Sequence, residues 1–101
     1  MNKAITEKRN WKLANTEVVT VDGVSTVYLH SNRIAEVGDN FVRLYDGGWQ
    51  STTTKSRLNA ILREHGLPGE CVFQKKWQWF VTVKTSTELA TIPFFSSMRL
   101  G

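Results

Sequence analysis

A chain of 101 residues has the length of one ordinary domain, and with 41% hydrophobic and 11% aromatic residues it can bury a core, which excludes a disordered protein. No apolar run approaches the roughly 20 residues of a membrane helix. The net charge is +4, and the whole excess lies in residues 51–101, which favours a polyanionic partner, although a solvated basic surface would show the same bias.

The first fifteen residues are polar apart from Trp11 and Leu13, so we predict an N-terminal arm over 1–15, either a short helix that docks Trp11 or a mobile tail. Residues 16–101 are predicted to form a single α+β domain. Charged residues at the start without an apolar run behind them predict that no secretory signal is present. Cys71 is a single thiol, which suits a reducing cytoplasm.

Residues 17–45 carry the pattern of an antiparallel meander. Strands are predicted over 17–21 and 24–30, around a tight turn at Asp22-Gly23. Two further strands, over 33–37 and 41–45, end at the turn-forming segments 38–40 and 46–48.

The apolar period then changes to that of a helix. Leu58, Ile61 and Leu62 share one face of a helix predicted over 53–65. One of residues 51–53 is expected to cap its start, and Gly66 to end it in the left-handed conformation.

Two strands, over 71–74 and 77–84, are predicted around a turn at Lys75-Lys76. In the second strand Trp77 and Trp79 share a face with Val81, which favours burial of both indoles. Pro93 limits the apolar tail over 89–95 to an edge strand or an extended segment.

These elements predict an α+β fold in which an antiparallel sheet of five to six strands carries one main helix on one face. The order is a four-stranded meander, then the helix, then a β-hairpin. The sheet residues expected in the core are Val27, Leu29, Ile34, Phe41 and Val81.

The sequence shows no catalytic apparatus, so we expect no catalytic residue, metal or cofactor. His30, His65 and Cys71 lack the paired spacing of a metal site. Gly47-Gly48 lacks the spacing of a phosphate-binding loop. His65, at the helix C-terminus, is explained by the favourable helix dipole, which stabilises an imidazolium without any catalytic role.

Basic and aromatic residues are the better candidates for function, because amines neutralise phosphates and flat rings stack on bases. We predict a non-enzymatic protein that binds DNA or RNA. A second possibility within this hypothesis places the helix in a duplex groove, with Asn59 reading adenine and Arg63 reading guanine. The predicted contact residues are Lys55, Arg57, Asn59, Arg63, Lys75, Lys76, Trp49 and Trp77.

The alternative function is a protein–protein interaction module, which either inhibits a host factor or forms a homodimer. The apolar C-terminal segment would be its contact surface, because exposed aromatic clusters mark interfaces. The predicted contact residues are Ile92, Phe94, Phe95 and Met98.

A resemblance covers residues 28–100 and is carried by Gly48-Trp49, by Thr52-Thr53-Thr54-Lys55-Ser56-Arg57-Leu58-Asn59 and by Val72-Phe73-Gln74-Lys75-Lys76-Trp77-Gln78-Trp79-Phe80-Val81. This pattern of a strand pair, a helix and a hairpin that ends in Trp-Phe-Val resembles small bacteriophage-encoded proteins without an assigned function. The resemblance implies the cytoplasm of an infected bacterium as the location, and it transfers no functional residue.

Overall fold

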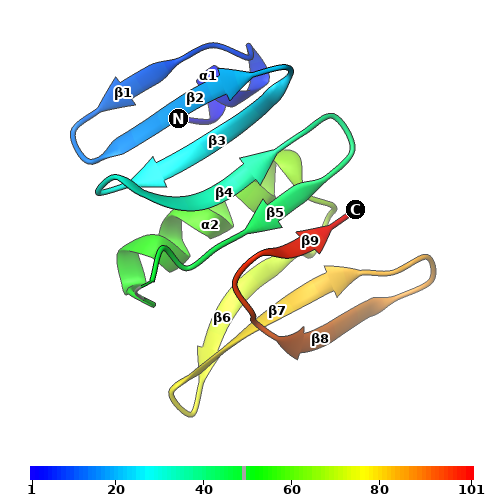
Figure 1. The fold of residues 1–101 in the computed structure, drawn as a ribbon. Coiled ribbons are helices and arrows are strands. Elements are labelled where there is room, and N and C mark those ends of the chain that lie inside the picture. Colours follow the sequence, from blue (N-terminus) through cyan, green and yellow to red (C-terminus); the bar gives the residue numbers. More distant parts are fainter. Residues whose placement is uncertain (49) are drawn as a thin grey trace.

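The fold consists of a six-stranded antiparallel sheet, a three-stranded antiparallel sheet and one main helix. The computed structural model describes residues 1–48 and 50–101. The strand order is β1-β2-β3-β4-β5-β9 in the large sheet and β6-β7-β8 in the small one. Helix α2 lies across one face of the large sheet, and the small sheet lies beyond β9 (Figure 1). The predicted class, an antiparallel sheet of five to six strands with one main helix, is confirmed.

The predicted meander forms the centre of the large sheet. Asp22 and Gly23 have the positive φ expected at the first turn, and His30 and Ser31 supply a second turn of the same kind. The pairing of β3 with β4 shifts by one residue beside Tyr28, which is the signature of a β-bulge. The four strands are β2 (Thr16–Val21), β3 (Val24–Leu29), β4 (Asn32–Val37) and β5 (Val42–Leu44).

Two short strands extend this sheet at its edges. Within the predicted arm, α1 (Asn2–Thr6) is followed by β1 (Trp11–Leu13), which pairs with β2. Near the C-terminus, β9 (Met98–Leu100) pairs with β5. No strand was predicted at β9, because three residues are too few to show an alternating pattern.

Helix α2 (Thr52–His65) begins where its capping signal predicted, with the Ser51 hydroxyl accepting the Thr54 N–H at 3.1 Å. Its end differs from expectation, because Gly66 is extended, with φ −85° and ψ −175°. Glycine is still required there, since a Cβ would lie 2.8 Å from the Leu62 carbonyl oxygen. Gly66 therefore permits a close backbone approach and does not supply a left-handed cap.

The small sheet comprises β6 (Cys71–Lys75), β7 (Gln78–Lys84) and β8 (Leu89–Pro93). As predicted, Pro93 lies on an edge strand, β8, which pairs only with β7 among the described strands. Glu70 ties the start of β6 to the end of β7, because its carboxylate accepts the backbone N–H groups of Leu67 (2.8 Å) and Lys84 (3.0 Å).

The core lies between α2 and the large sheet and continues into the small sheet through Val72, Trp79 and Val81. Four of the predicted core residues of the sheet are buried, but Phe41 is only half-buried. Phe41 directly precedes the inward-facing Val42, so its ring lies on the opposite face of the sheet. No described helix is long and apolar enough to cross a membrane.

Candidate nucleic-acid interface

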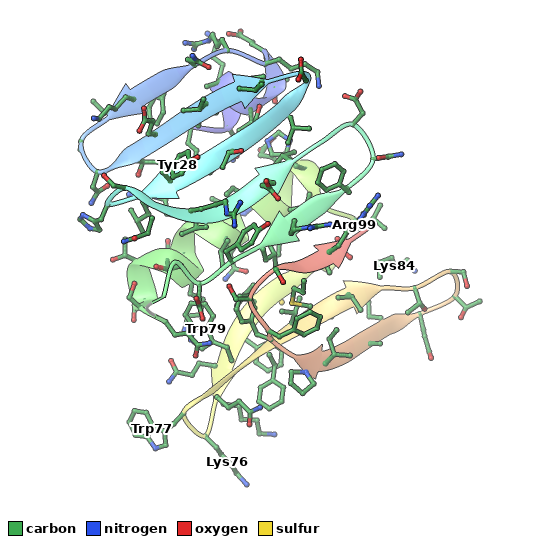
Figure 2. The ribbon with its side chains drawn as sticks, viewed as in Figure 1. Tyr28, Lys76, Trp77, Trp79, Lys84 and Arg99 are labelled. Carbon is green, nitrogen blue, oxygen red and sulfur yellow. The ribbon has the colours of Figure 1, made fainter. Side chains whose placement is uncertain are left out.

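The tip of the β6–β7 hairpin presents the most exposed large apolar side chain of the described residues. Lys75 pairs with Gln78, so Lys76 and Trp77 form a two-residue turn, with φ of 52° and 66°. The indole of Trp77 is 93% exposed. Lys76 and Trp77 project from this end of the hairpin away from the body of the protein (Figure 2). The predicted turn was one residue too early, and the interpretation of Trp77 as a core residue is wrong.

The part of the hairpin directly behind the tip is firmly packed. Trp79 is 3% exposed, and its ring meets Phe94 edge-on with the centroids 5.3 Å apart. The Phe94 N–H also donates to the Trp79 carbonyl at 3.0 Å. On the opposite face of the hairpin, Phe73 and Phe80 stack with centroids 5.7 Å apart. These ring pairs hold the strands together, so the tip is carried on a well-anchored support.

The hairpin is also free of acidic residues. Between Glu70 and Glu88 the chain contains Lys75, Lys76 and Lys84 and no Asp or Glu. Lys75 and Lys76 are exposed beside the indole, whereas Lys84 lies at the opposite end of β7. The tip therefore joins two amines to one uncovered aromatic ring, without a carboxylate of its own hairpin to neutralise them.

Asn59, predicted to read bases, instead binds the hairpin. Its side-chain amide donates to the Val72 carbonyl at 2.9 Å and accepts the Val72 N–H at 2.7 Å. Both hydrogen-bonding groups of the amide are thereby used to fasten α2 to β6. The prediction that Asn59 contacts adenine is wrong, because an asparagine needs those same groups to recognise the base.

The basic residues of α2 do not converge on the hairpin tip. Lys55 and Arg63 lie one turn before and one turn after Asn59, on the stripe of the helix that faces β6. They are separated by about 12 Å along the helix axis. Arg57 lies toward β2, with its Nε 3.4 Å from the Thr16 hydroxyl. Trp49, also a predicted contact, lies outside the described residues.

The apolar C-terminal segment is largely part of the core. Met98 is 2% exposed, so its prediction as an interface residue is wrong. Ile92 and Phe94 are partly buried against the core, and Phe95, at 58% exposure, is the one residue of the predicted set with most of its surface free.

His65 differs from the imidazolium that the helix dipole suggested. Burial lowers the pKa of His65. This effect outweighs that of the neighbouring Glu64 charge, which raises the pKa. Its Nε2 is buried without a hydrogen-bond partner among the described residues. Partial burial at the end of α2 therefore favours the neutral form of the side chain over the imidazolium. In the part of the chain that the structure describes, His, Cys, Asp and Glu side chains form no group of three suited to a metal ion.

Sequence reasoning missed a second basic group, on the face of the large sheet opposite α2. Arg43 of β5 and Arg99 of β9 are direct cross-strand neighbours, and Arg33 of β4 lies against the ring of Tyr45. Only the pairing of β5 with β9, more than fifty residues apart in the chain, brings the first two together. No local sequence signal indicates such a pairing.

No curated protein and no solved structure matches the chain significantly. A family model does match, and it does so over the full length, residues 1–101. Its description is the Kyanoviridae Gp96 protein, a family of phage proteins. The resemblance to small phage-encoded proteins is thus confirmed, and the chain belongs to the Kyanoviridae Gp96 protein family.

Proposed function

We propose that this phage protein is a non-enzymatic accessory factor that binds single-stranded nucleic acid through the hairpin tip. Trp77 would stack on a base while Lys75 and Lys76 contact the flanking phosphates. The observation that carries the proposal is the 93% exposure of an indole that directly follows two exposed lysines on an anchored hairpin. Stacking requires an open ring face, and electrostatic contact requires amines without carboxylate partners.

The identity of the turn residues supports a role outside folding. Two-residue turns with positive φ at both positions favour Asn-Gly, because most side chains are strained there. This hairpin instead places Lys76 and Trp77 at φ 52° and 66°. The His30-Ser31 turn carries the same kind of backbone strain, but only at the hairpin tip does the strained turn present an almost fully exposed indole.

A single strand fits this tip better than a duplex. A base in a duplex is already stacked on both sides, whereas an unpaired base offers a free face to an exposed indole. The duplex-groove hypothesis depended on Asn59, whose amide is occupied by Val72. The alternative, an interaction module based on the C-terminal segment, has weaker support because Met98 is buried.

The test measures binding of a fluorescently labelled single-stranded oligonucleotide by anisotropy. Trp77→Ala should weaken binding by about 1–3 kcal/mol, or roughly 5- to 150-fold in Kd, and Trp77→Phe should retain part of the affinity. Lys75→Gln with Lys76→Gln should lower the slope of log K against log salt by about 0.7 for each phosphate that the variant no longer neutralises.

The matched control is Lys3→Gln with Lys12→Gln, which removes the same charge from exposed residues outside the hairpin. This variant should bind like wild type. Equal affinities of wild type and Trp77→Ala would refute the proposal, as would an equal loss of affinity in the control.

A further inference from the structure

The outer face of the large sheet, opposite α2, carries a row of charged side chains. The register places Glu36 of β4 beside Arg43 of β5, and Arg43 beside Arg99 of β9. Directly opposed residues in antiparallel strands have Cβ atoms about 5 Å apart. The side chains of Arg43 and Arg99 therefore leave neighbouring strands side by side on the same open sheet face.

The one carboxylate in this row is already engaged. Glu36 accepts the Tyr45 hydroxyl at 2.7 Å and lies 3.8 Å from the Arg33 guanidinium. Among the described residues, neither Arg43 nor Arg99 has a carboxylate within 4.0 Å. Like charges directly opposed across strands destabilise a sheet, so folding alone does not account for this arginine pair.

Aromatic rings hold the arginines of this face in place. The Arg99 guanidinium lies over the Phe41 ring, 4.8 Å from its centroid, and Arg33 lies over Tyr45 at 4.1 Å. Phe41 in turn occupies the space where a side chain on Gly38 would sit, because a Cβ there would collide with the ring. A guanidinium stacked on a ring keeps its N–H groups directed sideways, where they can donate to an anion.

Arg43 is restrained more tightly than a surface arginine. Its Nε is buried without a partner among the described residues, and the residue as a whole is half-buried. An anion would therefore reach it through the terminal amino groups. Because a partly buried charge without a counter-charge costs free energy, an anion at this guanidinium would offset part of that cost.

We propose that Arg43 and Arg99 together form a phosphate-binding site on the open face of the large sheet, whose ligand is the backbone of the bound nucleic acid. A phosphate placed between the two guanidinium groups relieves their mutual repulsion and accepts hydrogen bonds from both. Charge complementarity selects the occupant, since Arg33, Glu36, Arg43 and Arg99 sum to two positive charges. The identity of the ligand as nucleic acid rests on the proposed function. The capacity of the two arginines to bind a phosphate does not.

The first arm of the experiment uses inorganic pyrophosphate and follows the arginine side-chain Nε–H signals by nuclear magnetic resonance. The buried Nε of Arg43 makes its signal well protected and observable. In wild type and in Trp77→Ala, the signals of Arg43 and Arg99 should shift and saturate. Absence of a saturable shift at both arginines would overturn the site.

The second arm measures oligonucleotide binding by Arg43→Gln with Arg99→Gln. Affinity should fall at least about tenfold, and the salt slope by about 1.4, because each of two contacts accounts for about 0.7. The Lys3→Gln/Lys12→Gln protein is the charge-matched control. Arg99→Gln alone changes an exposed residue, keeps the test valid if the double variant folds poorly, and should show about half of the slope change.

The outcomes separate the two proposals. If the arginine double variant binds the oligonucleotide like the control while Trp77→Ala does not, the arginine site is refuted and the function of the tip stands. If wild type responds to pyrophosphate at the arginines but binds no oligonucleotide, nucleic acid is refuted as the ligand of both regions.

Discussion

The β6–β7 hairpin carries two tryptophans, one at its tip and one in the strand directly behind the tip, that lie two residues apart and have opposite environments. Trp79 is buried against Phe94, and Trp77 is almost fully exposed (Figure 2). In an uninterrupted strand, residues two apart lie on the same face and would share one environment. The position of the turn, and not the residue type, therefore decides whether an indole packs in the core or remains exposed.

Cross-strand pairing explains why the turn falls where it does. In the observed register Val72 opposes Val81 and Phe73 opposes Phe80, so buried valines meet on one face and stacked rings on the other. A turn at Lys75-Lys76 would instead set Phe73 against the exposed Gln78. The favourable pairs outweigh the strain of positive φ at Trp77, which is of the order of 1–2 kcal/mol.

The sharpest test of this comparison is truncation of both tryptophans. Trp79→Ala should lower the free energy of unfolding by about 3–5 kcal/mol, because it removes a buried indole and leaves a cavity beside Phe94. Trp77→Ala should change it by less than about 0.5 kcal/mol. Urea unfolding followed by far-ultraviolet circular dichroism measures both. Similar losses in the two variants would contradict the contrast.

The base of the hairpin also depends on its attachment to α2. Asn59→Ala leaves the buried N–H and carbonyl of Val72 without their partners and should cost about 2–3 kcal/mol in the same unfolding measurement. Arg63→Ala, one turn further along the helix and exposed, is the matched control and should be nearly neutral. A neutral Asn59→Ala would show that α2 is not held to β6 through this amide.

Replacing the two turn residues of the tip should change the stability of the protein and its affinity for an oligonucleotide in opposite directions. Lys76→Asn with Trp77→Gly installs the residues that such a turn favours and should raise the free energy of unfolding by about 1 kcal/mol. The same variant should lose the stacking contribution to oligonucleotide binding. Trp77→Gly alone separates the relief of strain at the second turn position from the effect of asparagine at the first. A loss of stability on rebuilding would contradict the view that the tip is strained for the sake of binding.

The smallest effect on stability is expected for His65, which is half-buried at the end of α2. Burial lowers the pKa of His65, so the folded state holds fewer protons there than the unfolded state. Its stabilising contribution is present above the unfolded pKa of about 6.5 and is lost as the pH falls through the lower folded-state pKa. His65→Gln should therefore weaken the pH dependence of unfolding below about pH 6.5. Superimposable pH profiles would exclude His65 as a contributor.

Local signals in the sequence predicted most of the fold. Asp22-Gly23 specified the first turn, Ser51 capped α2, and Leu58, Ile61 and Leu62 marked its buried face. Each of these signals acts through neighbours within a few residues along the chain. These local interactions form whatever the position of the segment in the fold. The elements that they specify can therefore be predicted before the tertiary structure is known.

The candidate site was only partly predictable for the opposite reason. Lys75, Lys76 and Trp77 were recognised by their chemistry, but the exposure of Trp77 depended on the register with β6. Asn59 looked available on a helix surface until β6 was placed beside it.

The order of residues along the chain was enough to specify the meander, the main helix and the concentration of positive charge in residues 51–101. Three features emerged only when distant segments were packed together: Trp77 is free, Met98 is buried, and Arg43 lies beside Arg99. The exposure and partners of a side chain depend on which distant strand or helix covers it, and that information is carried by pairings between segments far apart in the chain.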